Sequence, residues 1–415
     1  MAEYANPADP KEGLFSFSGF RGLRNNIASD AFSPEDLEVA LNVDIDDSLA
    51  VGRRKGYSAP VTSGVDRDLW AEGSVCLGVG SNALKYINPD YTTTTLRSGL
   101  TANKFLSYAP VGDRVFWSNG SENGCVQGAV NRTWGLVVPS MPVAAATGGA
   151  LAAGLYQCVV TYLREDGQES GAGKAVTIEL TTIGGIALSA LSVSADPTVA
   201  HKAIYATSVG GETLYRVGII LNAGTTFLID EVHTGASLIL TQFLTSPPVG
   251  GAIGYWKGWM LVAKEAHLYP SEPFAPELFD LRRAVPFLDR ITMVAPVRDG
   301  IWIGTNSQVT WVAGDSPETW LYRVVAQYGV VPGTLTYGDG ELLGDGQGAG
   351  EPAAFFASKR GLCVGRVGGV FANLTESRFA YPIQDRGGAV VRRHRGIAQM
   401  VVTMQGAEVA GNVAA

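Results

Sequence analysis

The sequence predicts an all-β protein: an irregular β-propeller with an immunoglobulin- or fibronectin-like β-sandwich inserted into it. Three observations support this fold class. The chain has 52 glycines and 20 prolines without a collagen-like period, as expected when many short strands are joined by tight turns. Short apolar runs recur, separated by glycine-containing turns. Helix start signals are almost absent.

Length and composition bound the number of folding units. The chain has 415 residues, of which 46% are hydrophobic and 17% are charged. Such a chain buries enough apolar surface to be globular, and its length exceeds that of a typical single domain. We therefore expect two or three folding units.

The first folded segment extends from about residue 13 to residue 57. Ser33, Pro34 and two acidic residues predict a short helix or turn near residues 33–40, because serine caps helix N-termini and proline suits the first helical turn. Residues 42–46, Asn-Val-Asp-Ile-Asp, alternate at period two and predict a strand. A basic turn follows at residues 53–56.

A unit of apolar strands and glycine turns then recurs five times. Units of about 40 residues with several strands each are typical of propeller blades. In the fourth copy, Asp299-Gly300 predicts a two-residue hairpin turn with positive φ at both central residues. A strand from residues 42–46 is a candidate to complete one blade. The five copies lie at residues 69–88, 105–120, 251–273, 291–317 and 354–374.

The segment between the second and third copies differs in character. It begins with small residues, 143–154, which we interpret as a linker, and continues with five to seven short strands. Turns are expected at Asp166-Gly167 and Gly210-Gly211, and the lack of helix signals favours a sandwich. The predicted domains are residues 1–142 and 249–415 for the two parts of the propeller, and 143–248 for the inserted sandwich.

No motif in the sequence indicates catalysis, and we predict that the chain is not an enzyme. The four histidines lie outside any metal-binding spacing, and neither a Gly-x-Ser-x-Gly elbow nor a phosphate-binding Gly-Lys-Ser/Thr loop occurs. We assign no catalytic residue, cofactor or metal. Residues 338–348 are rich in glycine and acids, which suits a flexible loop or a cation site. Paired carboxylates of a glycosidase remain an open alternative, because their separation cannot be read from a sequence.

Charge defines one candidate contact surface. The formal net charge is −8, which does not favour tight binding to phosphates. An arginine cluster near the C-terminus reverses this balance locally, and it suits a contact with an acidic neighbouring subunit, a DNA contact or a solvated surface. The cluster comprises Arg378, Arg386, Arg392, Arg393 and Arg395.

Other notable side chains have structural interpretations. Five tryptophans lie in apolar runs, so we expect them to pack between strands rather than to bind sugars: Trp256, Trp259, Trp302, Trp311 and Trp320. The four cysteines are far apart and form no CxxC pair, so idle thiols are expected. The first residues lack a secretory signal pattern, and no apolar stretch approaches about 20 residues. We therefore expect no membrane span.

The N-terminal region carries a family resemblance. Gly22 and Asn25, the strand at residues 42–45 and the turn from Arg54 to Gly56 resemble the start of tail nozzle (tail tubular) proteins of short-tailed bacteriophages. The interrupted blade-like repeats and the inserted sandwich resemble the architecture of the same family.

The resemblance implies a structural protein of the virion tail, made in the host cytoplasm. It would form a ring, expected to be a hexamer, below the portal and adaptor, and it would contact tail fibre or spike proteins. Genomic DNA would pass through the ring without specific binding, which the acidic balance suits. Two alternatives remain: a carbohydrate-binding or glycoside-cleaving receptor-recognition propeller, and a tail plug that stabilises packaged DNA.

Overall fold

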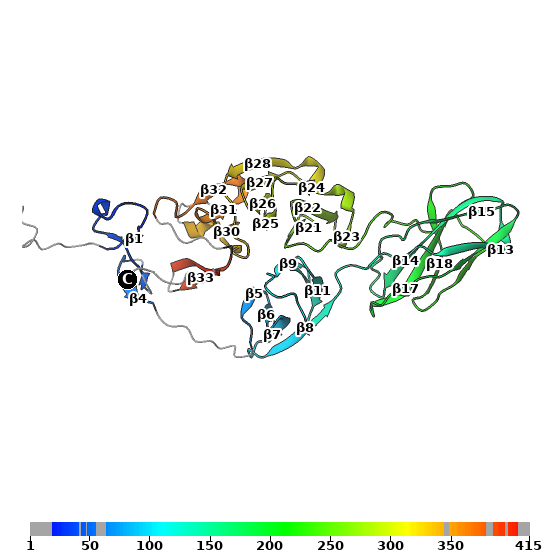
Figure 1. The fold of residues 1–415 in the computed structure, drawn as a ribbon, viewed down its shortest axis with the longest axis horizontal. Coiled ribbons are helices and arrows are strands. Elements are labelled where there is room, and N and C mark those ends of the chain that lie inside the picture. The colour runs from blue at the N-terminus through cyan, green and yellow to red at the C-terminus, as the bar shows by residue number, and fades with distance from the viewer. Residues whose placement is uncertain are drawn as a thin grey trace, which may run out of the picture.

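The computed structural model describes residues 19–40, 43–46, 48–54, 64–343, 348–378, 385–394 and 397–405. This part of the chain contains β-strands and short 3-10 helices and no α-helix, which confirms the all-β prediction. The molecule is elongated, with an array of sheets at its centre and a separate two-sheet unit at one end (Figure 1). The 3-10 helices are η1 (Ser29–Ala31), η2 (Leu281–Arg283), η3 (Pro317–Thr319), η4 (Gly340–Leu343) and η5 (Val367–Gly369).

Five antiparallel sheets, which we call the sheet array, correspond to the five repeated segments of the sequence. In each sheet the strands pair in chain order, and the third sheet has an additional strand, β24, on β22. The first sheet contains β5 (Arg67–Glu72), β6 (Val75–Gly80), β7 (Ala83–Ile87) and β8 (Thr93–Arg97). The second contains β9 (Ser107–Val111), β10 (Arg114–Ser118), β11 (Asn123–Gln127) and β12 (Val130–Arg132).

The last three sheets of the array follow the two-sheet unit in the chain. The third contains β20 (Ala252–Trp256), β21 (Trp259–Lys264), β22 (His267–Glu272), β23 (Ala275–Phe279) and β24 (Val285–Pro286). The fourth contains β25 (Ile291–Val297), β26 (Gly300–Thr305), β27 (Val309–Ala313) and β28 (Leu321–Ala326). The fifth contains β29 (Thr336–Asp339), β30 (Pro352–Ser358), β31 (Gly361–Gly365) and β32 (Phe371–Asn373).

Neighbouring sheets of the array share apolar cores. Strand β5 contacts β9, β9 contacts β20, β20 contacts β25, and β25 contacts β30. One core cluster spans each neighbouring pair of sheets, so burial of apolar area stabilises every step of the array. The tryptophans expected to pack between strands are buried as predicted: Trp256, Trp259, Trp302, Trp311 and Trp320.

The hairpin expected in the fourth sheet is present, but its turn differs from the prediction. Val297 pairs with Gly300, so Arg298 and Asp299 are the central residues of the turn, and neither has a positive φ. The prediction of positive φ at the Asp-Gly step was therefore wrong. Gly300 meets a packing requirement instead, since a Cβ there would lie 2.4 Å from the ring of Trp311.

The two-sheet unit lies between the second and third sheets in the chain. Its first sheet has the order β13-β16-β19 and its second the order β15-β14-β17-β18, and one apolar core fills the space between them. The seven strands are β13 (Val143–Leu151), β14 (Gly154–Arg164), β15 (Val176–Leu180), β16 (Gly184–Ser189), β17 (Val199–Thr207), β18 (Leu214–Leu221) and β19 (Phe227–Ile229).

Two turns of the unit are confirmed, and the predicted linker is corrected. Gly167 and Gly210 adopt positive φ at the expected turns. The small-residue segment from residue 143, interpreted as a linker, forms strand β13 for most of its length. Small side chains are needed there because a Cβ on Gly149 would lie 2.7 Å from the carbonyl oxygen of Gly184.

Short elements from both chain ends lie at the opposite end of the molecule from the two-sheet unit (Figure 1). Residues 34–35 form a turn rather than a helix, and the strand expected at residues 42–46 pairs with β4 instead of completing a sheet of the array. These elements are β1 (Gly22–Leu23), β2 (Asp36–Leu37), β3 (Val43–Ile45), β4 (Val51–Arg53), β33 (Arg386–His394) and β34 (Ile397–Gln405).

Candidate functional site

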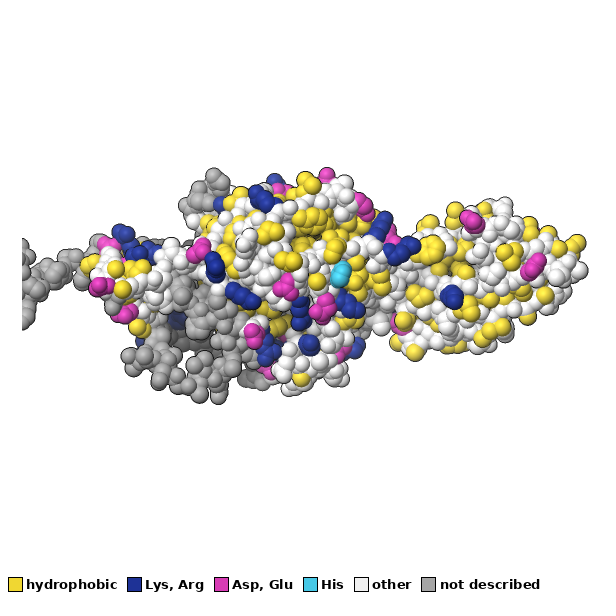
Figure 2. Space-filling view, turned by 45° about the horizontal axis from the view of Figure 1, so that its top comes forward, with side chains coloured by type: hydrophobic (Ala, Val, Ile, Leu, Met, Phe, Trp, Pro, Cys, Tyr) yellow, Lys and Arg dark blue, Asp and Glu magenta, His cyan; other side chains and the backbone are white. Residues whose placement is uncertain are grey.

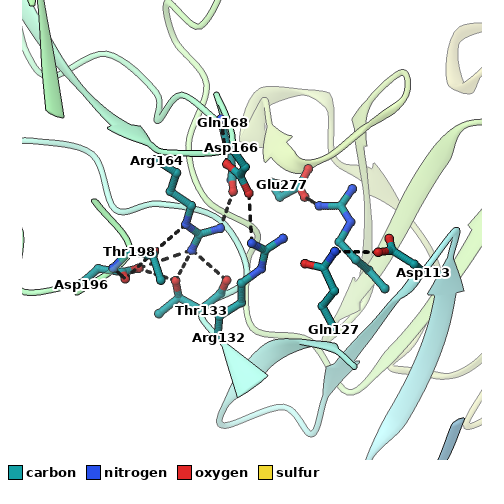
Figure 3. A network of polar contacts seen from close by, with 11 residues as sticks. Asp113, Gln127, Arg132, Thr133, Arg164, Asp166, Gln168, Asp196, Thr198 and Glu277 are labelled. Carbon is teal, nitrogen blue, oxygen red and sulfur yellow. Dashed lines mark hydrogen bonds and ion pairs between the residues drawn. The ribbon is translucent and has the colours of Figure 1, made fainter. Parts of the chain in front are cut away.

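A buried polar network joins the two-sheet unit to the second sheet of the array, and it is the most elaborate site in the described residues (Figure 3). Strand β14 ends at Arg164, directly beside the segment that leaves β12. The side chains of Arg164 and Asp196 are only 2% and 8% exposed. Two buried charges at a connection between folding units must be matched by hydrogen bonds, because an unpaired buried charge is strongly destabilising.

The guanidinium of Arg164 uses all three of its nitrogens. Nη2 donates to the carbonyl oxygen of Thr133 at 3.0 Å and lies 3.4 Å from Oδ2 of Asp196. Nε donates to Oγ1 of Thr198 at 2.7 Å, and Nη1 donates to Gln168. One side chain of β14 thus fixes the position of the connecting segment.

Asp196 remains ionised in this buried place. Burial alone would raise its pKa, but hydrogen bonds from Thr133 and Thr198 and the charge of Arg164 outweigh burial and hold the pKa below its usual value. The carboxylate also caps its own turn, because Oδ1 accepts from the backbone N–H of Thr198 at 2.9 Å. The ion pair and the local turn therefore support each other.

Further contacts extend this connection toward the third sheet. Nη1 of Arg132 donates to Oδ2 of Asp166 at 3.0 Å, and Arg114 forms an ion pair with Glu277. Nε1 of Trp134 donates to the carbonyl oxygen of Pro276 at 2.8 Å. Gly135 has a φ of 76°, and a Cβ there would lie 2.8 Å from the carbonyl oxygen of Glu277. Glycine is required by both the backbone conformation and the close approach.

The interface of the first and second sheets contains a different buried carboxyl, Asp68. A β-bulge between Arg67 and Trp70 and a φ of 53° at Asp68 accompany a side chain that is 4% exposed. Nη1 of Arg67 donates to its Oδ2 at 2.9 Å. Burial nevertheless raises the pKa of Asp68 to about 6, because the opposing effect of Arg67 is smaller.

The arginines predicted as a contact cluster are distributed over separate contacts within the chain. Arg378 donates to the carbonyl oxygen of Arg21 at 2.6 Å, which attaches the N-terminal elements to the segment after the fifth sheet. Arg386 donates to the carbonyl oxygen of Asn103 at 3.2 Å. Nη2 of Arg392 donates to Gln399 at 2.7 Å across the β33–β34 hairpin.

The other two arginines of the predicted cluster are Arg393 and Arg395. Arg393 pairs with Ala398 in the backbone ladder of the hairpin, and Arg395 lies outside the described residues. A role of the cluster in subunit or DNA contacts stays a prediction.

A cavity of about 470 Å³ opens between the ends of β28 and β32. Rings of Tyr328 and Phe371 line it together with the charged side chains of Arg360 and Glu376. The guanidinium of Arg360 lies over the Tyr328 ring, 5.6 Å from its centroid, as in a cation–π contact. The cavity is therefore lined by both aromatic and charged side chains.

Side-chain clusters for a metal and long apolar helices are both absent from the described part of the chain. No group of three or more His, Cys, Asp or Glu side chains there has metal-binding geometry, and no helix there is long and apolar enough to cross a membrane. In the acidic loop at residues 338–348, Oδ1 of Asp339 accepts from the backbone N–H of Glu341 at 2.9 Å; residues 344–347 lie outside the described residues. The four cysteines are free thiols, as expected.

The sequence interpretation missed both buried carboxyls and Arg164. Arg164 ends a long apolar strand, and an arginine at that place is the one signal that could have indicated a buried charge. Asp68 gives no such signal, because its burial depends on the bulge in β5 and on contact with the second sheet.

Comparisons with known proteins assign no family to the chain. No family model matches the chain, and no curated protein matches its sequence. One similar solved structure is the crystal structure of a puromycin hydrolase mutant, with 12% sequence identity and a TM-score of 0.21. The match covers 83% of this chain and 60% of that chain. A likeness this weak supports no argument about function.

Proposed function

We propose that the chain is a non-catalytic structural subunit of the tail of a short-tailed bacteriophage, and that it forms a nozzle ring below the portal and adaptor. One observation carries the proposal: a succession of five sheets is interrupted after the second by a separate two-sheet unit. This order matches the architecture implied by the N-terminal resemblance at Gly22, Asn25 and residues 42–45.

The two parts of the fold each have a specific architecture under this proposal. The five sheets, each sharing a core with the next, are the blades of an irregular β-propeller. The two-sheet unit is an immunoglobulin- or fibronectin-like sandwich. The corresponding domains are residues 1–142 with 249–415, and residues 143–248.

The buried network at the connection supports a mechanical role. A rigid connection between its parts suits a structural subunit, and charged groups that are buried and fully hydrogen-bonded resist bending. Arg164 and Asp196 supply such groups at the connection. Arg378 supplies a second attachment, between the N-terminal elements and the end of the fifth sheet.

The charge of the chain suits passage of DNA. The formal net charge of −8 repels phosphates on average, so a channel lined by such a surface would let the genome slide without specific binding. The portal-adaptor ring and tail fibre or spike proteins are the expected partners. A tail plug that stabilises packaged DNA is the closest alternative, and it shares this charge argument.

A carbohydrate-binding receptor-recognition protein is the second candidate, and the cavity between β28 and β32 favours it. Tyr328 and Phe371 offer aromatic faces for a sugar ring, while Arg360 and Glu376 offer partners for its hydroxyl groups. Sugar binding that is lost in Tyr328→Ala would support this candidate. Tyr337→Ala is the matched control, because Tyr337 is also a partly exposed tyrosine of the array.

Cryo-electron microscopy of phage tails that contain the chain tests the proposal. We expect six copies arranged as a ring beneath the portal and adaptor, with the array around the channel. Absence of the chain from purified virions would overturn the proposal. A location at a fibre tip, away from the channel, would favour the receptor-recognition alternative.

A further inference from the structure

Strand β28 presents the most exposed apolar edge of the sheet array. Leu321, Tyr322 and Val324 are 74%, 48% and 49% exposed. Its backbone pairs with β27 on one side, and on its other side no named strand of the described residues pairs with it. Figure 2, in which the rim carrying β28 is turned forward, shows hydrophobic side chains gathered over this part of the array.

Unprotected edges of this kind are uncommon, because a free strand edge recruits other strands. Outer strands of three other sheets are short or polar: β12 and β32 have three residues each, and β8 has the sequence Thr-Thr-Thr-Leu-Arg. The one charged side chain in β28 does not protect its edge, since Arg323 donates to the carbonyl oxygen of Gly369. This edge is therefore expected to be covered in the assembled protein.

The chain itself contains a segment suited to cover it. In residues 14–18, Phe15 and Phe17 alternate with Ser16 and Ser18, which is the period-two pattern of a strand with one apolar face. Side chains of Tyr322 and Val324 lie on one face of β28, because strand side chains alternate. Added beside β28, the two phenylalanines would form cross-strand pairs with these residues, and aromatic and β-branched pairs stabilise sheets.

The position of Phe20 argues against the same copy as the source of this strand. Gly19 follows the segment directly, and the next residue, Phe20, is hydrogen-bonded to Leu49 at the β3–β4 turn. The two Cα–Cα steps from Ser18 to Phe20 span less than about 8 Å when fully extended. In Figure 1 the fifth sheet lies between β1–β4 and β28. A second copy is the source that fits.

We propose that residues 14–18 of one copy pair with the free edge of β28 in the neighbouring copy, so that each ring contact is made by strand addition. The inference rests on the proposed ring. It implies a head-to-tail contact, in which one surface of a copy binds a different surface of the next, and such contacts close into rings.

A cross-linking experiment between two full-length variants tests the contact. One variant carries Phe17→Cys, the other carries Val324→Cys, and both carry Cys76→Ser, since the remaining cysteines are buried. After mixing and mild oxidation we expect a disulfide-linked pair of chains. Val193→Cys in place of Val324→Cys is the matched control, because Val193 is similarly exposed but lies in the two-sheet unit.

The outcomes separate this inference from the ring proposal, with the assembly of the same mixtures measured by mass photometry. Rings with a strong Phe17→Cys to Val324→Cys cross-link support the inference. Rings whose cross-link is no stronger than the control overturn it and leave the ring proposal standing. Monomers without a cross-link contradict both.

A second variant, Val324→Lys, tests the same contact without a cross-link. Val324 is exposed, so the monomer should keep its thermal stability, whereas a lysine on the edge should raise the concentration needed for assembly at least tenfold. Unchanged assembly would count against the contact.

Discussion

Asp68 and Asp196 are both buried where two parts of the chain meet, and their environments shift their pKa values in opposite directions. Asp196 accepts hydrogen bonds from Thr133 and Thr198 beside Arg164, which hold its pKa low. Burial dominates at Asp68 and raises its pKa to about 6. The difference shows that the supply of hydrogen-bond donors, and not burial alone, decides whether a carboxyl stays charged.

The two interfaces consequently suit different tasks. The connection to the two-sheet unit depends on a buried ion pair that a missing partner would leave uncompensated. The interface of the first and second sheets depends on apolar packing around Trp117 and contains one carboxyl whose pKa is raised to about 6 by burial. The connection to the two-sheet unit is therefore stabilised by paired charges, whereas the interface of the first and second sheets is stabilised by apolar packing.

Removing the charge of Arg164 is expected to have the largest effect. Arg164→Met leaves Asp196 buried without its cation, so the free energy of unfolding should fall by about 3–5 kcal/mol. Urea unfolding followed by circular dichroism measures the loss, and hydrogen exchange at residues 133–142 shows whether it is local to the connection.

A double variant sharpens this prediction. Arg164→Met combined with Asp196→Leu removes both charges, so it should be more stable than Arg164→Met alone. If the losses in free energy of unfolding caused by the two single changes add up in the double variant, the ion pair does not stabilise the connection.

Asp68→Asn is expected to have the next largest effect, through pH. The folded state keeps the Asp68 proton up to about pH 6, whereas the unfolded chain loses it near its ordinary value of 3.8. This carboxyl therefore stabilises the fold fully below about pH 4, and that stability is lost as the pH rises to about 6, by about 3 kcal/mol. Asp68→Asn should remove this dependence.

Thermal unfolding of the original chain and of Asp68→Asn from pH 4 to pH 7 measures the difference. The variant should gain relative stability above pH 6. Asp196, with its lowered pKa, acts in the opposite sense, because its contribution is present above pH 3.8 and is lost below it. Parallel pH profiles for the two proteins would contradict the raised pKa of Asp68.

The smallest effect is expected for the exposed ion pair of the connection. Asp166 is 45% exposed, so Arg132→Ala should cost about 1 kcal/mol or less, and the cost should shrink in 1 M NaCl. The same urea unfolding experiment measures it. A loss as large as that of Arg164→Met would mean that burial does not distinguish the two pairs.

Local patterns in the sequence predicted the strands and their grouping well. The recurring apolar runs indicated five sheets, and the tryptophans such as Trp302 were correctly expected in the interior. Local sequence patterns did not predict the features that depend on contacts between residues distant in the sequence. Strand β13 was taken for a linker, because only the close approach of Gly184 shows why its residues must be small. The turn before Gly300 was misread, because the ring of Trp311, and not the turn, requires glycine at that position.

The two buried carboxyls could not be predicted, for the same physical reason. The environment of Asp68 depends on the second sheet, and that of Asp196 depends on Thr133 and Arg164, which are distant in sequence. The predicted arginine cluster shows the converse. Arg378 and Arg386 are close in sequence, but they contact separate parts of the chain.

Ring formation is the central claim, and the mass of the purified chain in solution tests it most directly. Mass photometry and light scattering over a concentration series should show six copies of the 43.7 kDa chain as one discrete assembly at high concentration. A strict monomer at every concentration, together with absence of the chain from purified virions, would contradict the account.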